Sequence, residues 1–228
     1  MKINGAIFIL SVLSFVVLSG CGGDNDQTSD VDHKPNNGHG VMDHGISKTD
    51  ADVVETFSSG NHKGELKAQA VMENTDGENV GSVSFYSTEN AVMVKANVES
   101  FSSGFHGFHI HENGICEADA EEGAFMSAGG HYNPGSHSHD RHSGDMPSIF
   151  VTENGKGYLV SKLDRFTPEQ LIEDDVAVII HEDPDNFAHI PDRYQSSKQD
   201  TPGPDEQTLK TGDAGDRAAC GVVVKVEQ

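Results

Sequence analysis

The chain has 228 residues, of which 15 are Lys or Arg and 37 are Asp or Glu, so its formal net charge at pH 7 is -22. Nucleic acids and anionic lipid surfaces are poor partners for so acidic a chain, because both repel it. Thirteen histidines and only three cysteines favour imidazole chemistry over a thiolate metal cluster.

The first 20 residues have the layout of an export signal. A single Lys2 precedes an apolar run, Ala6–Leu18, which is too short to span a bilayer. The four residues that end at Cys21, Leu-Ser-Gly-Cys, resemble the bacterial lipoprotein signal, in which the cysteine becomes the lipidated first residue. We therefore expect residues 1–20 to be removed and the protein to be exported. A lipid on Cys21 would anchor it to the cell envelope, on the periplasmic side of an outer membrane or at the cell surface.

Residues 21–62 have almost no large apolar side chains, so they cannot bury enough surface to offset the entropy of ordering. We interpret this segment as a disordered tether. It either loads copper or is simply a soluble tail, and its candidate ligands are His33, His39, Met42 and His44. The remaining segment, 63–228, has the length of one domain with a sizeable core.

The pattern of this domain predicts short strands. Apolar and polar residues alternate from Leu66 to Met72 and from Val92 to Val98, which is typical of strands with one buried face. Further strands are expected around the hairpin turn Asn154-Gly155 and in near-continuous apolar runs, over residues 148–153, 156–162, 176–180 and 221–226. About eight strands with turn signals between them favour an antiparallel sandwich or barrel.

Two segments depart from the strand pattern. Thr167-Pro168-Glu169-Gln170 is a capping box with proline at the first helical position, and it predicts one short helix. The segment between His181 and Gly212 has no period and contains four prolines. A loop this long inside a compact domain is usually functional or disordered, and its place directly after a histidine favours function.

Histidines gather in the middle of the chain. His109 and His111 lie one residue apart on an expected strand, so both imidazoles point to the same face and can chelate a metal. A third imidazole, His131, follows in a glycine-rich turn. More candidate ligands come soon after it, namely His137, His139, His142 and Asp145. Imidazoles with one carboxylate and no thiolate suit zinc and copper, and we expect two metal positions that share a wall.

Five blocks occur in a fixed order between Gly64 and Val226: GFHIHE at 107–112, AGGHYNP at 128–134, SGD at 143–145, IHE at 180–182 and GDAGDRAACG at 212–221. Together they resemble the bacterial copper, zinc superoxide dismutases. The resemblance implies an all-β, immunoglobulin-like fold, a Greek-key antiparallel sandwich or flattened barrel with long metal-binding and electrostatic loops. It also implies dismutation of superoxide to dioxygen and hydrogen peroxide by a redox-cycling copper next to a structural zinc, one of each per chain.

Carried over residue by residue, the resemblance implies two sets of ligands. Copper is expected to bind His109, His111, His131 and His181. Zinc is expected to bind His131, His139, His142 and Asp145. The shared His131 would bridge both metals and take up a proton when copper is reduced. The zinc loop is shorter than the common family pattern, so His137 remains an alternative to His139, which keeps the usual spacing of eight from His131.

The same resemblance implies several further roles. If Cys21 carries lipid, Cys116 and Cys220 are left as an even pair in an oxidising compartment, and the resemblance implies a disulfide between them. Arg217 would dock the superoxide anion beside copper. Asp185 would be the outer carboxylate that links a copper histidine to a zinc histidine. Lys210 is the nearest candidate for steering an anion toward a chain that repels it at long range.

Two other functions remain open. A hydrolytic zinc enzyme also uses a His-x-His pair, but Asn113 replaces the expected acid, and His181 has no role in that reading. A copper-binding lipoprotein of the same fold, serving as a copper store or donor, is the stronger alternative, although it would not require Arg217. His106 and His189 fit no ligand position and are expected to be surface or hydrogen-bonded histidines. The sequence allows a homodimer without indicating one.

Overall fold

A computed structural model of the chain describes residues 64–227. The chain divides into two units, Met1–Ser47 and Lys48–Gln228, and every described residue belongs to the second. The predicted signal peptide, the tether with its histidines, and Cys21 all lie outside the described residues. Within residues 64–227, the structure contains no helix with the length and apolar character needed to cross a membrane.

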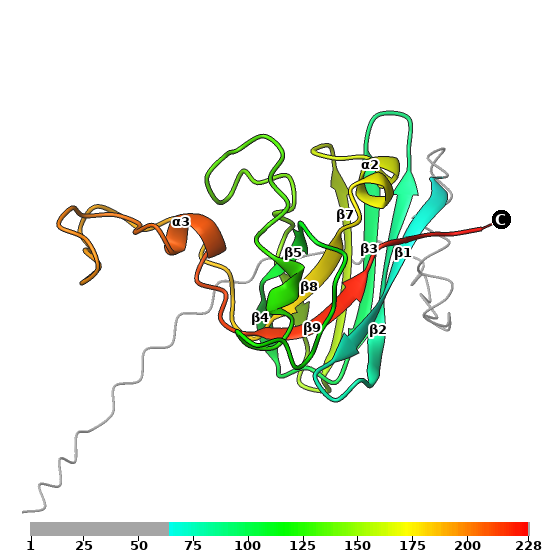
Figure 1. Cartoon of the computed structure of the whole chain (residues 1–228), viewed down its shortest axis with the longest axis horizontal. Coiled ribbons are helices and arrows are strands. Elements are labelled where there is room, and N and C mark those ends of the chain that lie inside the picture. The colour runs from blue at the N-terminus through cyan, green and yellow to red at the C-terminus, as the bar shows by residue number, and fades with distance from the viewer. Residues whose placement is uncertain (1–63, 228) are drawn as a thin grey trace, which may run out of the picture. The chain divides into compact units, whose positions relative to one another are not determined.

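Ten strands form one sheet, and every strand pair in it is antiparallel. The strands are β1 (Glu65–Asn74), β2 (Asn79–Ser87), β3 (Val92–Glu99), β4 (Gly104–His106), β5 (Phe108–His111), β6 (Ile149–Val151), β7 (Lys156–Leu163), β8 (Ala177–His181), β9 (Arg217–Val222) and β10 (Val224–Lys225). Within residues 64–227, three short helices accompany them, η1 (Met126–Ala128), α2 (Pro168–Glu173) and α3 (Thr208–Thr211) (Figure 1).

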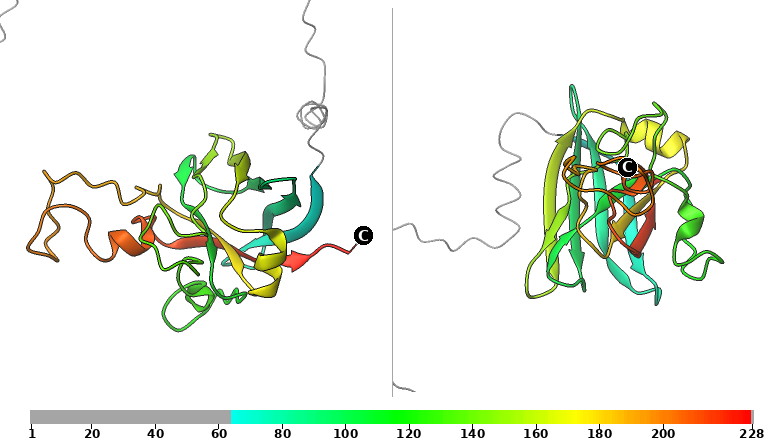
Figure 2. Two further views of the ribbon diagram at one scale, coloured as in Figure 1. Left: turned by 90° about the horizontal axis from the view of Figure 1, so that it is seen from above. Right: turned by 90° about the vertical axis from the view of Figure 1, so that its left-hand side faces the viewer.

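The path through the sheet explains its closed form. The strand order is β4-β6-β7-β3-β2-β1-β9-β8-β5, with β10 beside β1. The two ends of this path, β4 and β5, follow each other in the chain with only Gly107 between them. The sheet therefore curls round until its ends meet, and the views in Figure 2 show the strands wrapped round a common interior. This confirms the predicted all-β antiparallel fold with the form of a flattened, nearly closed barrel.

The core follows the period of two that strands impose. On β3, Val92, Val94, Ala96 and Val98 are buried, and they face other buried apolar residues of β1 and β2. Strands β5 and β8 are buried along their whole length. On β5, Phe108 and Ile110 belong to the main core, so the alternate residues face the other side of the sheet. On that side of the sheet, the long connection between β5 and β6 covers His109 and His111.

The local predictions can now be compared with the structure. The predicted helix is present as α2, where Thr167 Oγ1 accepts from Gln170 N and Gln170 Oε1 accepts from Thr167 N. The turn at Gly155 joins β6 to β7. The predicted strand over 221–226 was wrong in its bounds. Strand β9 begins at Arg217, and the buried Val223 separates it from β10.

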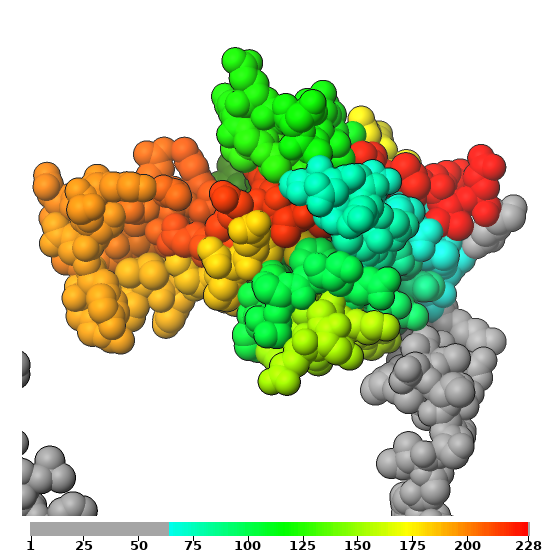
Figure 3. Space-filling view, turned by 90° about the horizontal axis from the view of Figure 1, so that it is seen from below, coloured from blue at the N-terminus to red at the C-terminus, as the bar shows by residue number. Residues whose placement is uncertain are grey.

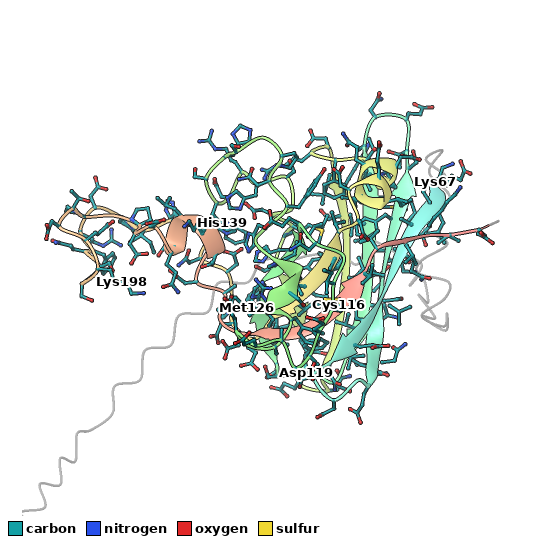
Figure 4. The ribbon with its side chains drawn as sticks, in the orientation of Figure 1. Lys67, Cys116, Asp119, Met126, His139 and Lys198 are labelled. Atoms are coloured by element: carbon teal, nitrogen blue, oxygen red, sulfur yellow. A yellow bond between two sulfur atoms is a disulfide. The ribbon has the colours of Figure 1, made fainter. Side chains whose placement is uncertain are left out.

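A disulfide joins Cys116 to Cys220, as predicted, with their Cα atoms 5.6 Å apart. Cys220 is in β9, and Cys116 begins the connection that follows β5, so the bridge ties this connection to the barrel (Figure 4). Around the bridge lies a second apolar cluster that includes Phe125 and Ile179. The bridge therefore fixes a loop whose backbone, described below, contacts the candidate site.

Removing both cysteines, as Cys116→Ser/Cys220→Ser, should lower the free energy of unfolding by about 4 to 5 kcal/mol on the chain-entropy model. The reason is that the bridge spans a separation of 104 residues, which the unfolded chain would regain as freedom. Urea unfolding followed by circular dichroism measures the change. Reduced wild-type protein should match the double variant, and an unchanged unfolding midpoint in both would contradict the prediction.

Candidate metal centre

The site is built on the outer face of β5. His109 and His111 alternate with the core residues of this strand and are buried there, and His181 ends the neighbouring strand β8. His131 joins them because its segment runs antiparallel to β5 and pairs with His111. One ring nitrogen from each of these four histidines lies within 4.8 Å of the others. The structure thus brings the predicted copper ligands together.

The hydrogen bonds of these rings leave one nitrogen free on each of three histidines. The outer nitrogens are engaged, with His111 Nδ1 3.0 Å from Gly129 O and His181 Nδ1 3.2 Å from Gly215 O. Among the four rings of this group, three buried inner nitrogens have no hydrogen-bond partner, namely His109 Nδ1, His111 Nε2 and His181 Nε2. A histidine that binds a metal through one ring nitrogen usually has a hydrogen bond at the other ring nitrogen, as these rings do. This donor set fits copper.

Burial explains the charge state of these rings. It lowers the pKa of His109 and lowers the pKa of His111 and His181 still further below the usual value. It also lowers the pKa of His131, to about 3. Neutral imidazole is the form that binds one metal, so His109, His111 and His181 need lose no proton to do so at neutral pH. His131 would have to lose its remaining N–H proton to bind two metals.

The second group of ligands converges on Asp145. Its Oδ1 atom lies 2.9 Å from His131 Nδ1, 3.1 Å from His139 Nδ1 and 3.3 Å from His142 Nδ1. The Nδ1 atoms of His131 and His142 are 3.3 Å apart. Four tetrahedral ligands about 2.0 to 2.1 Å from zinc would lie roughly 3.3 to 3.4 Å from one another. All four residues are buried, and the set fits zinc with little adjustment. His131 belongs to both groups.

Asp185 links the two groups from behind. Its Oδ2 atom is 2.6 Å from His109 Nε2, and its carboxylate oxygens are 2.9 and 3.0 Å from His139 Nε2. Burial by itself lowers the pKa of His139, but hydrogen bonds with Asp145 and Asp185 raise it to about 9. A proton and zinc therefore compete for this ring. Burial raises the pKa of Asp185, whereas its hydrogen bonds to the two histidines more than offset this and hold it well below the usual range.

Arg217 is half-buried beside the copper group. Its Nη1 donates to Phe125 O at 2.5 Å and its Nη2 donates to Gly129 O at 2.6 Å. The Gly129 carbonyl also contacts His111 Nδ1, so one carbonyl orients both the guanidinium and a copper-group histidine. Burial lowers the pKa of Arg217, yet a guanidinium titrates so high that it stays charged. The sequence had no signal for Phe125 and Gly129 as partners, because only their backbone oxygens take part.

The remaining predicted residues lie outside both ligand groups. His137 is exposed, and its backbone pairs with the Asn133 side chain. His189 is exposed, whereas His106 is buried with its ring nitrogens 2.7 Å from His181 O and 2.9 Å from Ser102 O, as expected of a hydrogen-bonded histidine. Lys210 Nζ lies 2.6 Å from Oε1 of Glu206, four residues earlier in the chain. This pairing offsets its charge at a distance, and its steering role stays a prediction.

A comparison with known families agrees with this geometry. The family model described as copper/zinc superoxide dismutase matches residues 79–223. The chain belongs to this family. It is 46% identical over 127 residues to the Cu-Zn superoxide dismutase of Mycolicibacterium paratuberculosis, covering 53% of this chain and 56% of that one. It is 31% identical over 173 residues to Cu-Zn superoxide dismutase 2 of Aquifex aeolicus, covering 70% and 87%.

Solved structures of the family's kind resemble the fold as well. A double mutant of a SOD-like protein from Bacillus subtilis matches with a TM-score of 0.52 and 25% identity, covering 68% of this chain and 95% of that one. The chain spans little more than half the length of the mycobacterial relative. Membership of the dismutase family implies copper and zinc, and both groups of ligands fit these metals on their own geometry.

The geometry around Asp145 predicts which histidine of the short loop binds zinc. His139→Ala and Asp145→Ala should each lose zinc and keep copper, because each removes one of four converging donors. His137→Ala is the matched control and should retain both metals, since that ring is exposed. Metal content of the purified variants by mass spectrometry tests this. Zinc kept by His139→Ala and lost by His137→Ala would reverse the assignment.

Proposed function

We propose that this protein dismutates superoxide to dioxygen and hydrogen peroxide outside the cytoplasm. The observation that carries the proposal is one buried imidazole, His131, shared by two complete ligand groups beside a fixed guanidinium. Copper, when bound, supplies the redox chemistry, taking an electron from one superoxide and giving it to the next. The copper, zinc and bridging assignments of the individual residues are part of this proposal.

The chain's own residues would bind and protonate the substrate. Arg217 keeps its charge and is held at two points, so it can dock an anion without reorganising. His131 Nδ1 faces Asp145, which leaves Nε2 as the atom that can hold a proton for the peroxide product. Asp185 orients His109 and His139 together, so that the two ligand groups keep their spacing.

A copper store or donor of the same fold remains the alternative function. Such a carrier needs the histidines but has no use for a guanidinium held beside them. The two hydrogen bonds that fix Arg217 to the loop backbone therefore favour the enzyme. They restrict a charged side chain at an entropic cost that metal storage alone would not require.

We also propose that the protein is exported and held at the cell envelope by lipid on Cys21. The support is the sequence of residues 1–21, with its short apolar run and its final Leu-Ser-Gly-Cys. The mature protein should begin at Cys21 and carry the mass of diacylglycerol, and intact-mass spectrometry of protein from membranes checks this. An unmodified Cys21 would remove the anchor without affecting the proposed chemistry.

A homodimer remains a proposal that sedimentation analysis can test. An exposed apolar pair on β4 and β6 supports it, since Phe105 and Phe150 are cross-strand partners with ring centroids 5.0 Å apart. Phe105 is 57% exposed and Phe150 is 51% exposed, so the two rings form one adjoining apolar patch rather than single scattered residues. A second copy of this chain would cover them.

Arg217→Ala and His181→Ala should separate the two functions. Loss of one copper ligand in His181→Ala should abolish dismutation. Arg217→Ala should keep copper but lower kcat/KM about 10- to 100-fold, because charge-assisted hydrogen bonds contribute about 1.5 to 3 kcal/mol. A riboflavin and nitroblue tetrazolium assay on copper-loaded protein measures both. Wild-type protein that binds copper without dismutating would favour the store, and undiminished activity in His181→Ala would contradict the proposed site.

A further inference from the structure

The four donors of the zinc group are not held equally. His131 and Asp145 lie on segments that pair with β5, where Tyr132 N donates to Ile110 O at 2.8 Å and Ile110 N donates to Gly144 O at 2.9 Å. These two donors therefore share the rigidity of the barrel. His139 and His142 lie on the turn between those segments, residues 133–142, which we call the zinc turn. They need support from elsewhere.

One contact of the zinc turn supports His139. Its backbone N–H donates to Leu209 O at 2.9 Å, in the segment around α3 that projects from the barrel (Figure 3). Figure 4 shows His139 beside this helix. Within the zinc turn itself, Asn133 pairs with the backbone of His137. The peptide N–H of His142 donates to Asp145 Oδ2 at 2.9 Å, and the His142 carbonyl accepts from Asp145 N at 3.2 Å. Both contacts come from another member of the zinc group.

Arg165 contacts the same peptide from outside the zinc group. Its Nη1 atom donates to Asp140 O at 2.9 Å and to His142 O at 3.1 Å. Asp140 has a φ of 71°, in the left-handed region that a residue other than glycine adopts only at a cost. A donor that holds both carbonyls therefore stabilises a strained turn and fixes the backbone of a zinc-group histidine.

The base of Arg165 is itself rigid. It lies between β7 and α2, and the next residue, Phe166, is buried against Phe85 with ring centroids 6.2 Å apart. One residue further, Thr167 caps α2. The Arg165 side chain thus connects the segment between β7 and α2 to the backbone of the zinc turn. The family resemblance assigned Arg165 no role.

We propose that Arg165 is a positioning residue that orders the zinc turn and holds His142 in place for zinc. The inference rests on the zinc site of the proposed function and adds a residue outside both ligand groups. The zinc turn is shorter than in the common family pattern, and a longer insertion could stabilise its own backbone. Here the Arg165 side chain supports the zinc turn instead.

The direction in which zinc affinity changes when Arg165 is replaced distinguishes a positioning role from a purely electrostatic one. Removing a positive side chain near a cation should, by Coulomb attraction alone, strengthen zinc binding. Losing the support of His142 should weaken it. The zinc turn offers a matched control in Arg141, which is 71% exposed and whose Nε lies 3.9 Å from the Asp140 carboxylate. Arg141→Met removes the same charge without touching a loop carbonyl.

The test is the zinc dissociation constant of the copper-loaded full chain, measured by competition with a chromophoric chelator. We expect Arg165→Met to bind zinc about tenfold more weakly than wild type, at the lower end of effects seen for residues behind the ligands. Arg165→Lys should recover part of the loss, because its ammonium can still donate to the carbonyls. Arg141→Met should match wild type or bind slightly more tightly. Equal constants for Arg165→Met and Arg141→Met would overturn the proposal.

Hydrogen exchange gives a second readout that needs no zinc. In the full chain prepared without metals, amides of the zinc turn should exchange faster in Arg165→Met than in Arg141→Met, with the barrel strands unchanged. Unchanged exchange in the zinc turn would also overturn the proposal. A wild-type chain that bound no zinc would remove the zinc part of the proposed function, while the exchange comparison would still decide the role of Arg165.

Discussion

The backbone pairing along the outer face of β5 is the interaction on which the whole centre depends. Phe108 and Ile110 bury one face of this strand in the core, so His109 and His111 must point to the other. The peptide of Ile110 then pairs with Tyr132 on one loop and Gly144 on the same loop further along. Any shift of this register would move His131 and Asp145 together, because both lie on the paired segments.

The loops around this strand carry the chemistry, and each is tied to the barrel by a different kind of bond. The connection after β5 is held by the disulfide at Cys116, and it returns two backbone carbonyls to Arg217. The long segment after β8 is held by Asp185, whose carboxylate is bound by two histidines. Function thus rests on loops that a rigid scaffold fixes at a few points. The disulfide and the guanidinium therefore hold the same connection at different points.

Charge is distributed on two scales. The chain as a whole is strongly acidic, whereas the copper group is a cluster of neutral rings with one guanidinium beside them. An exposed pair such as Lys210 with Glu206 contributes little to the electrostatic potential at a distance. Its two charges cancel each other, and the remaining field is screened within about 8 Å. The carboxylates that matter at the centre, Asp145 and Asp185, are buried and held by histidines. The proposed anion binding would therefore depend on Arg217 at the centre itself.

The sequence by itself determined what depends on spacing along the chain. The alternation at His109 and His111, the capping box before α2 and the hairpin at Gly155 follow from short-range patterns. The pairing of the two cysteines, which are 104 residues apart, followed from their even number and the family likeness. Only the tertiary structure decided what depends on chain segments meeting. It chose His139 over the nearby His137 as the buried ring, broke the last predicted strand at Val223, and paired Lys210 with an acid. It also revealed the backbone oxygens behind Arg217 and the reach of Arg165 across the zinc turn. A sequence lists side chains, but the path of the backbone decides which carbonyl lies within hydrogen-bonding distance of which side chain.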